Sequence, residues 1–407
     1  MKYVVVGASA AGINAAKTLR RLDSGAEITI VSKDEVIHSR CIMHHYLKGK
    51  RGLEQLSFVK PSFMADNNIE WKKGAEVVGV DAGGNAVLLA DGSKVCYDKL
   101  LLAAGASSFF PRAIKNFDEA RSGIIGFRNI DDAITIKKLA AEPGVQNIVV
   151  LGAGLVGIDA IEGLLGFGKN IALVELYSHL LGRQLDAHAA KAYEQAFTLA
   201  GVKQYYGTKI TELELDFDNA VRKVELSSGV RIPCDLFIVT SGVSPNVAFL
   251  QGSAVVCDER GLVFDRFGRT NVDNIYGAGD ISGRSPIWPA AVKEGIIAAY
   301  NMAGQPLEQT DFFASKSTMN FLGIATMSIG SPEPPDSSYS VEIDLDGNGG
   351  YKKIIHKDGE IKGAIIQGDL SYSGILTQLI KAKVDVSKLQ KPLFKINYSD
   401  FFGEFAF

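Results

Sequence analysis

The chain has 407 residues, of which 46% are apolar and 22% charged, so it can bury a large core and is expected to fold into two or three domains. A formal net charge of −3 and the lack of a long Lys/Arg run argue against nucleic acid or an anionic membrane as partners. No apolar run reaches the roughly 18 residues of a membrane span, and the first predicted strand leaves no room for a signal segment before it, so we expect a cytoplasmic protein.

The N-terminal segment reads as strand, helix and strand around a glycine-rich turn, Gly7-x-Ser9-x-x-Gly12. Such a turn lets the backbone approach a pyrophosphate at the N-terminus of the helix, as in Rossmann units that bind dinucleotides. Ser9 replaces the usual second glycine but is still small. Ser32 and Lys33 lie where an acid normally receives the adenosine ribose, so contacts to a ribose are expected near them.

The same pattern returns over residues 147–175, with the turn Gly152-x-Gly154-x-x-Gly157. Glu175 follows at the end of the next predicted strand, where a carboxylate accepts a ribose 2′-hydroxyl and repels a 2′-phosphate. No Lys or Arg occupies the five positions after it. The second turn therefore predicts a site for NADH rather than NADPH, and two turns of this kind predict two dinucleotides in one protein.

Two further buried strands are predicted at residues 100–103 and 236–240, each followed by a turn with a glycine, Ala104-Gly105 and Ser241-Gly242. Ligands of open α/β sheets bind at such strand ends. From about Phe312 the pattern changes to β-rich segments with hairpin turns, which indicates a separate α+β domain.

The cysteines are too far apart in sequence to form a CxxC or CxxxxC pair: Cys41, Cys96, Cys234 and Cys257. This spacing argues against an iron-sulfur cluster, a zinc site and an adjacent redox dithiol. We predict no metal site, and any iron-sulfur centre is expected to belong to a partner.

Near residue 280 an apolar strand ends at Gly279-Asp280, and at this point the chain resembles the FAD-dependent pyridine-nucleotide oxidoreductases. The resemblance covers nearly the whole chain. It implies an α/β fold with two Rossmann-like domains and a C-terminal α+β interface domain. Residues 1–110 and 241–310 would form the FAD domain, 111–240 an inserted NAD(H) domain, and 311–407 the interface domain, through which the protein could join an oligomer or a complex.

Residues 37–41 and 286–295 look most like NADH-rubredoxin reductases and the flavin region of nitrite reductase large subunits. Arg40 matches a family Arg that contacts FAD, with a surface cation as the alternative. Trp288 matches an aromatic residue near the flavin, with a core Trp as the alternative. The cofactor-binding residues implied are Gly7, Ser9, Ala11, Gly12, Ser32, Lys33, Arg40, Ala104, Gly105, Gly152, Gly154, Val156, Gly157, Glu175, Gly242, Gly279, Asp280 and Trp288.

Three residues are candidates for chemistry. Cys41 occupies the place of the single redox cysteine of NADH oxidases, NADH peroxidases and coenzyme A-disulfide reductases, and Arg40 and a following helix would favour its thiolate. Ile42 follows it where those enzymes usually have Gly, so an inert, packed Cys is the alternative. His45 and Asp159 form a hypothetical acid/base pair between the nucleotides, unless both are solvated helix residues.

The resemblance implies an FAD-dependent NADH oxidoreductase that takes a hydride from NADH onto FAD and exchanges electrons with rubredoxin, ferredoxin or an iron-sulfur partner subunit. The alternative enzyme uses Cys41 as an NADH oxidase or peroxidase, or as a coenzyme A-disulfide or persulfide reductase. A third hypothesis is a non-catalytic flavin-binding subunit for assembly or redox sensing.

Overall fold

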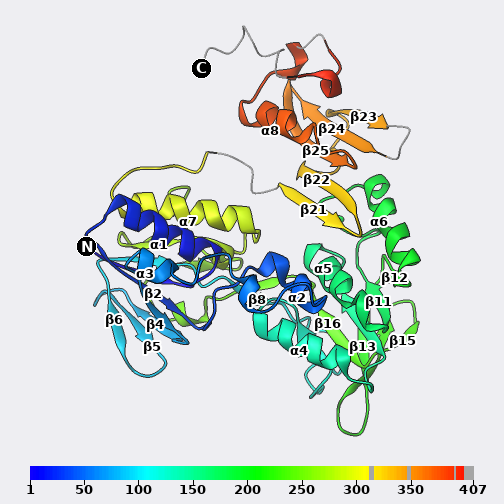
Figure 1. Ribbon diagram of the computed structural model, residues 1–407, viewed down its shortest axis with the longest axis horizontal. Coiled ribbons are helices and arrows are strands. Elements are labelled where there is room, and N and C mark those ends of the chain that lie inside the picture. Colours follow the sequence, from blue (N-terminus) through cyan, green and yellow to red (C-terminus); the bar gives the residue numbers. More distant parts are fainter. Residues whose placement is uncertain (311–315, 346–349, 389–390, 398–407) are drawn as a thin grey trace. The chain divides into compact units, whose positions relative to one another are not determined.

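A computed structural model describes residues 1–310, 316–345, 350–388 and 391–397 (Figure 1). The chain forms two compact units. The first contains residues 1–110, 126–137 and 242–314, and the second contains residues 111–125, 138–241 and 315–407. The expected start of a C-terminal domain at residue 311, like Phe312, lies outside the described residues. The predicted division into three domains stays a prediction.

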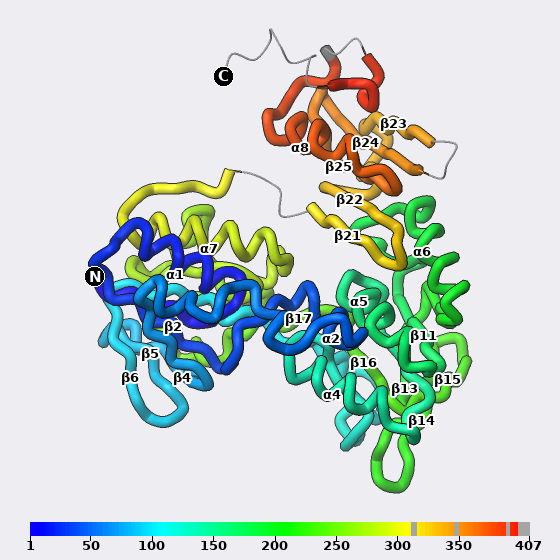
Figure 2. Tube along the Cα trace, viewed as in Figure 1, coloured from blue at the N-terminus to red at the C-terminus, as the bar shows by residue number. Residues whose placement is uncertain are grey.

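The first unit is built on a five-stranded parallel sheet in the order β20-β7-β1-β2-β3. Strands β1, β2, β7 and β20 are mostly apolar and buried because both faces of the sheet are covered, whereas the edge strand β3 is polar. Helices α1 and α7, far apart in the sequence, lie side by side (Figure 2). The elements are β1 (Lys2–Val6), α1 (Ala10–Leu22), β2 (Glu27–Ser32), β3 (Glu70–Lys73), β7 (Lys99–Leu102), β20 (Ile275–Gly277) and α7 (Trp288–Met302).

Smaller elements complete this unit. An antiparallel sheet is formed by β4, β5 and β6, and two-stranded ribbons are formed by β8 with β17 and by β18 with β19. Two short helices, α2 and α3, follow β2. Their bounds are α2 (Met43–Leu47), α3 (Phe63–Asp66), β4 (Val77–Asp81), β5 (Ala86–Leu89), β6 (Lys94–Cys96), β8 (Ala106–Ser108), β17 (Val243–Pro245), β18 (Cys257–Asp258) and β19 (Gly261–Leu262).

The second unit repeats the Rossmann arrangement with a sheet in the order β12-β11-β10-β16-β9. Strands β10, β11, β12 and β16 pair in parallel, and α5 starts directly after the turn that follows β10. Helix α4 (Ile130–Ala141) runs from the first unit into the second. The other elements are β9 (Ile124–Gly126), β10 (Asn147–Leu151), α5 (Leu155–Leu164), β11 (Asn170–Val174), α6 (Ala187–Leu199), β12 (Lys203–Tyr205), β13 (Ile210–Leu215), β14 (Val221–Leu226), β15 (Arg231–Pro233) and β16 (Leu236–Val239).

The C-terminal part of the second unit is an antiparallel sheet in the order β21-β22-β25-β24-β23, with helix α8 after it. Strand β21 contributes two buried apolar side chains to this sheet, Met319 and Phe321. The bounds are β21 (Ser317–Phe321), β22 (Ile324–Gly330), β23 (Ser340–Leu345), β24 (Tyr351–Lys357), β25 (Glu360–Gln367) and α8 (Ser373–Lys381).

A buried polar cluster joins this sheet to α6. Lys353 Nζ lies 2.8 Å from Asp186 Oδ2, and both side chains are only 6% exposed. Asp186 is also the N-cap of α6, where it accepts a hydrogen bond from Ala189 N, and it accepts another from the Tyr351 hydroxyl. Burial alone would raise the pKa of Asp186, but these hydrogen bonds and Lys353 hold it below its usual range.

Within the described residues, the structure contains no helix that combines the length and the apolar character needed to cross a bilayer.

Candidate dinucleotide sites

The first glycine-rich turn joins β1 to α1 with almost no space to spare. Gly7 has φ +110°, and a Cβ on it would lie 2.2 Å from Ala103 O. A Cβ on Gly12 would lie 1.9 Å from Gly7 O. Only glycine permits this close packing of helix on strand, which brings the first amides of α1 to the carboxyl end of the sheet.

Both Rossmann helices begin without a side-chain cap. Ser9, the N-cap of α1, and Gly154, the N-cap of α5, make no capping hydrogen bond within the described chain, and neither helix has an acid in its first turn. Helix α6 is different, because Asp186 caps it. The first amides of α1 and α5 are therefore left for an anion, which the positive end of the helix dipole attracts.

In the second glycine-rich turn, Gly157 is tightly packed, whereas Gly154 faces open space. A Cβ on Gly157 would lie 1.8 Å from Gly152 O, whereas a Cβ on Gly154 would meet no described atom within 4 Å. Val156, in the first turn of α5, is 37% exposed. Packing thus explains Gly157, but no described neighbour requires a glycine at position 154, and the open space there fits the diphosphate of a dinucleotide.

Glu175 follows β11 and is 8% exposed. Its Oε2 accepts a hydrogen bond from Ala153 N at 2.5 Å, and its Oε1 accepts one from Tyr177 N at 2.9 Å. The carboxylate is therefore held directly beside the second turn. A negative group in this position attracts ribose hydroxyls and repels a phosphate.

In the first unit, Asp280 follows β20 and forms an ion pair with Arg128, whose Nε donates to Ala106 O at 3.1 Å. Both paired side chains are nearly buried. The sequence analysis expected Asp280 but missed Arg128, because an Arg in the short segment before α4 carries no pattern of its own. Only the folded chain brings Arg128 close to Asp280, at the end of β20.

Arg40 joins the same cluster. Its Nη1 lies 3.5 Å from the position that a Cβ on Gly105 would take, and its Nη2 donates to Asn129 Oδ1 at 3.3 Å. Its buried Nε has no hydrogen-bond partner among the described residues. Burial, and then the neighbouring Arg128, lower the pKa of Arg40 to about 10, against the opposing effect of Asp280. Arg40 and Arg128 together carry more positive charge than Asp280 neutralises, and Arg40 Nε still has a hydrogen bond to donate. This arrangement fits an anionic diphosphate.

Glu294, on α7, is a second residue that no sequence pattern pointed to. Its Oε2 accepts a hydrogen bond from Gly279 N at 2.7 Å, and burial together with the charge of Asp280 raises its pKa to about 7. Glu294 therefore fixes the backbone at the start of the Gly279-Asp280 turn. Ala11 supports the same region, because its backbone packs against Gly295 of α7.

The remaining expected cofactor residues differ in their surroundings. Ser32 is buried and accepts a hydrogen bond from Trp71 Nε1, whereas Lys33 is exposed and lies 3.3 Å from Glu76. Trp288 begins α7 half-buried, with its ring edge-on to Phe58 at 4.8 Å. The turns at Ala104-Gly105 and at Gly242, which has φ +133°, are tied together, because the Asn246 amide donates to Ala104 O at 2.9 Å.

The three candidates for chemistry lie on helices. Cys41 is exposed within a short 3-10 helix, Arg40–Ile42, directly before α2. His45 lies in α2 of the first unit and Asp159 in α5 of the second. Burial and then nearby cations lower the pKa of His45, which keeps the imidazole neutral at pH 7. A pairing of His45 with Asp159 stays a prediction.

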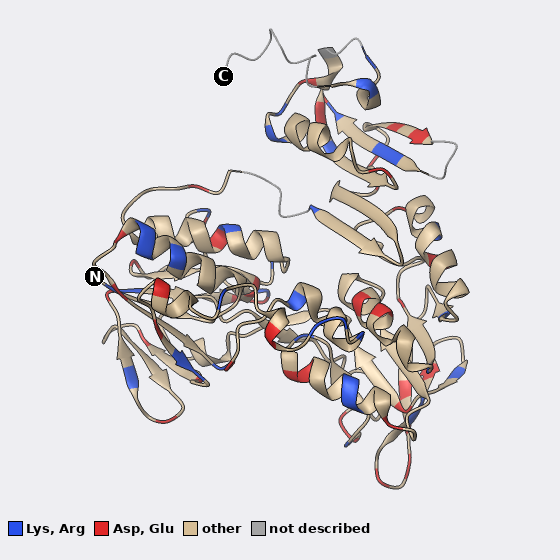
Figure 3. Ribbon diagram, viewed as in Figure 1, with Lys and Arg blue, Asp and Glu red and all other residues tan. Residues whose placement is uncertain are grey.

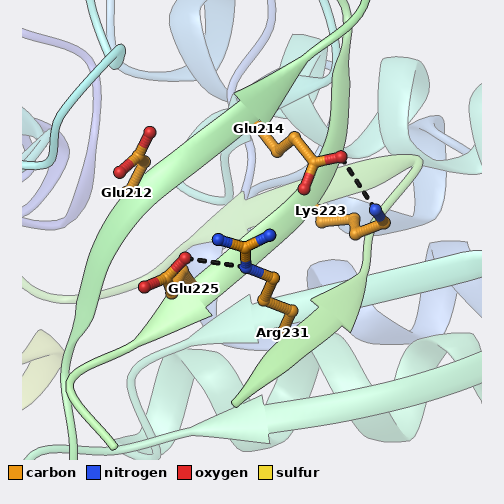
Figure 4. Close-up of a pocket in the computed structure, with 5 residues that line it drawn as sticks. All are labelled: Glu212, Glu214, Lys223, Glu225 and Arg231. Carbon is orange, nitrogen blue, oxygen red and sulfur yellow. Dashed lines mark hydrogen bonds and ion pairs between the residues drawn. The ribbon is translucent and has the colours of Figure 1, made fainter. Parts of the chain in front are cut away.

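The surface of the second unit also has a small hollow, over β13, β14 and β15 (Figure 4). Glu214 pairs with Lys223 at 2.8 Å and Arg231 with Glu225 at 2.9 Å, and Glu212 completes the lining. Glu212 pairs with Lys115 at 2.9 Å instead, so each of these charges has a partner, and none belongs to either glycine-rich turn. The hollow is a solvated ion-pair surface.

Comparison with known proteins gives two family matches. Residues 1–295 match the pyridine nucleotide-disulphide oxidoreductases, and residues 316–384 match the rubredoxin NAD+ reductase C-terminal domain.

Individual relatives span the same region. The chain is 32% identical to the epsilon subunit of NADH-dependent phenylglyoxylate dehydrogenase from Aromatoleum evansii, covering 96% of this chain and 93% of that one. It is 26% identical to nitrite reductase [NAD(P)H] from Bacillus subtilis, covering 96% of this chain but only 48% of that protein. The solved NADH:rubredoxin oxidoreductase of Clostridium acetobutylicum has the same fold, with a TM-score of 0.75, 22% identity and coverage of 96% and 97%.

Proposed function

Because the chain belongs to the pyridine nucleotide-disulphide oxidoreductases, a family of FAD-dependent NAD(P)H oxidoreductases, we propose that it transfers electrons from NADH to an iron-sulfur protein or partner subunit. The observation that carries this proposal is the presence of two glycine-rich turns on separate Rossmann sheets in one chain. Bound FAD would accept two electrons as a hydride and release them singly, which suits a one-electron acceptor.

Each cluster of side chains has a distinct part in this proposal. In the second unit, Gly154 and the first amides of α5 would hold the NADH diphosphate, and Glu175 would accept hydrogen bonds from the adenosine ribose. In the first unit, α1, Arg40 and Arg128 would hold the FAD diphosphate, and Asp280 would orient the ribityl chain. Hydride transfer depends mainly on the relative orientation of the two bound rings, so these binding groups would supply much of the catalysis.

Two matches support an iron-sulfur acceptor. The C-terminal sheet matches a domain of rubredoxin reductases, and the relative of 32% identity is a subunit of a larger NADH-dependent enzyme. The four cysteines are too dispersed to hold a cluster within this chain. We therefore propose that the acceptor is a separate protein or subunit. We also propose that the chain works in the cytoplasm.

The experiment is an anaerobic acceptor panel. The FAD-loaded protein is first reduced with NADH, and then oxidised rubredoxin, ferredoxin, a disulfide and peroxide are added in turn while flavin absorbance is followed. The proposal expects fast reoxidation by an iron-sulfur protein and slow reoxidation by the others. Fast reoxidation by the disulfide or peroxide alone would contradict it.

The exposure of Cys41 beside Arg40 favours one second candidate, a thiol-dependent reductase of a persulfide, coenzyme A disulfide, peroxide or oxygen. That function requires a thiolate at position 41. Cys41→Ser would abolish it but would leave reduction of an iron-sulfur acceptor intact, so the variant separates the two candidates.

A further inference from the structure

Helix α7 carries only two charged residues, Lys293 and Glu294, which follow each other near its middle (Figure 3). Glu294 lies where α7 meets α1 and the turn after β20, because its Oε2 accepts a hydrogen bond from Gly279 N at 2.7 Å. The next residue, Gly295, touches the start of α1, since a Cβ on it would lie 2.3 Å from Ala11 O. The carboxyl group is therefore held close to the helix end at which the FAD diphosphate would bind.

A second carboxylate, Asp280, follows directly on the same turn. It forms an ion pair with Arg128, whereas Glu294 forms none with any described residue. The elements that pack against α7 bring no cation to Glu294. Helix α1 has its first charged residue at Lys17, and β20 offers only Tyr276, whose hydroxyl donates to a backbone carbonyl of α7. Among the described charged groups, Asp280 is the one that acts on Glu294.

Two neighbouring carboxylates that are shielded from water cannot both be ionised without a cost in free energy. Burial and then the charge of Asp280 raise the pKa of Glu294 to about 7, although the hydrogen bond from Gly279 N opposes this rise. Without FAD, Glu294 is therefore about half protonated near neutral pH. A change of charge beside it shifts this balance.

Bound FAD would supply such a change. Without it, Arg40 and Arg128 exceed Asp280 by one positive charge. The two negative charges of the diphosphate would turn this excess into a deficit, and an ionised Glu294 would deepen the deficit. A protonated Glu294 avoids the repulsion, and its carbonyl oxygen can still accept the hydrogen bond from Gly279 N.

We propose that the binding of FAD to the first unit is accompanied by the uptake of a proton from solvent onto the Glu294 carboxyl, an inference that rests on the assignment of FAD to this unit in the proposed function. Glu294 is then a positioning residue that holds the turn before Asp280 and sets the pH dependence of FAD affinity. The affinity is highest below pH 7, where Glu294 is already protonated. It falls as the pH rises above 7, because binding must then supply the proton.

The experiment measures the Kd for FAD as a function of pH. The FAD-loaded protein is diluted at each pH, and the released FAD is measured by its fluorescence; the slope of log Kd against pH gives the number of protons that accompany binding. Glu294→Gln keeps an acceptor for Gly279 N but cannot ionise. Glu308→Gln, which removes an exposed acid of the same unit, is the matched control.

We expect the wild-type Kd to increase about fivefold between pH 7 and about pH 8.5, and the Kd of Glu294→Gln to change by less than about twofold. The control is expected to follow the wild type. Parallel curves for the wild type and Glu294→Gln, a wild-type Kd that stays constant or decreases with pH, or an equally flat curve for Glu308→Gln would overturn the proposal. Glu294→Ala takes the place of Glu294→Gln if the latter retains no FAD.

The same samples separate this inference from the proposed function. If Glu294→Gln removes the pH dependence of FAD binding but NADH reduces the flavin in none of the proteins, the proton uptake stands and the proposed function fails. If NADH reduces the wild-type flavin while the Kd for FAD does not depend on pH, the proposed function stands and the inference fails.

Discussion

Glu175 is held beside the second glycine-rich turn by two backbone hydrogen bonds, so its charge has a fixed position. We predict that Glu175→Gln lowers the ratio of kcat/KM for NADH to that for NADPH by about tenfold, since it removes the repulsion between a carboxylate and a 2′-phosphate. Steady-state kinetics with both nucleotides measure the ratio. Leu176→Gln, at an exposed position next to it, is the control and is expected to leave the ratio unchanged. An unaltered preference in Glu175→Gln would show that another group selects the nucleotide.

Glu294 gives a prediction about pH because its pKa is raised to about 7. In the unfolded chain this carboxyl titrates near its ordinary value of 4.5, so between pH 4.5 and 7 the folded state binds more protons. The contribution of Glu294 is therefore most favourable below pH 4.5 and is lost as pH rises to 7, by about 3 kcal/mol. In Glu294→Gln, which retains an acceptor for Gly279 N, this part of the pH dependence is absent.

Urea unfolding of the flavin-free wild type and Glu294→Gln between pH 5 and 8 measures the difference. Glu308→Gln is a control, because Glu308 forms an exposed ion pair with Arg266. Parallel pH profiles for wild type and Glu294→Gln would disprove the raised pKa.

At the scale of residues, the sequence predicted positions that follow a spaced pattern next to a strand. Gly12, Gly157 and Glu175 belong to such patterns, and the structure places each beside its turn. Arg128 and Glu294 belong to none. They reach the Gly279-Asp280 turn only because β20, α7 and the segment before α4 meet in three dimensions. Pairwise contacts between distant segments leave no local periodicity to detect.

At the scale of elements, the contact between α6 and β24 depends on a buried ion pair. Lys353→Ala would leave Asp186 charged and buried, and we predict a loss of about 3 kcal/mol in the free energy of unfolding. Lys352→Ala, which breaks the more exposed pair with Asp344, is expected to cost less than about 1 kcal/mol. Chemical denaturation measures both, and equal small losses would mean that the buried cluster does not hold the sheet to α6.

The strands and helices of the two Rossmann sheets were predictable because buried parallel strands are continuous apolar runs with glycine-rich turns after them. The C-terminal sheet was predicted only as β-rich. Its attachment to α6 through Asp186, Tyr351 and Lys353 was not predictable, since polar residues in an alternating strand normally indicate a solvent-facing side.

At the scale of the whole molecule, each unit carries one Rossmann sheet and one set of uncapped helix amides. In the proposed function, FAD binds to the first unit and NADH to the second. Damage to one site should therefore leave the other ligand bound.

Gly154→Ala tests this assignment, because its methyl group enters space that no described atom fills, whereas Gly157→Ala would collide with Gly152 O. We expect Gly154→Ala to unfold at the wild-type temperature and Gly157→Ala to be destabilised. Thermal unfolding of the two variants measures this contrast.

The most direct measurement of the central claim is anaerobic rapid mixing of the FAD-loaded wild type and Gly154→Ala with increasing NADH, followed by flavin absorbance. The account predicts that NADH removes the absorbance of the wild type, and that Gly154→Ala keeps its full flavin content but needs about tenfold more NADH for the same rate. Flavin that stays oxidised in the wild type, or a Gly154→Ala protein that loses FAD and responds normally to NADH, would contradict it.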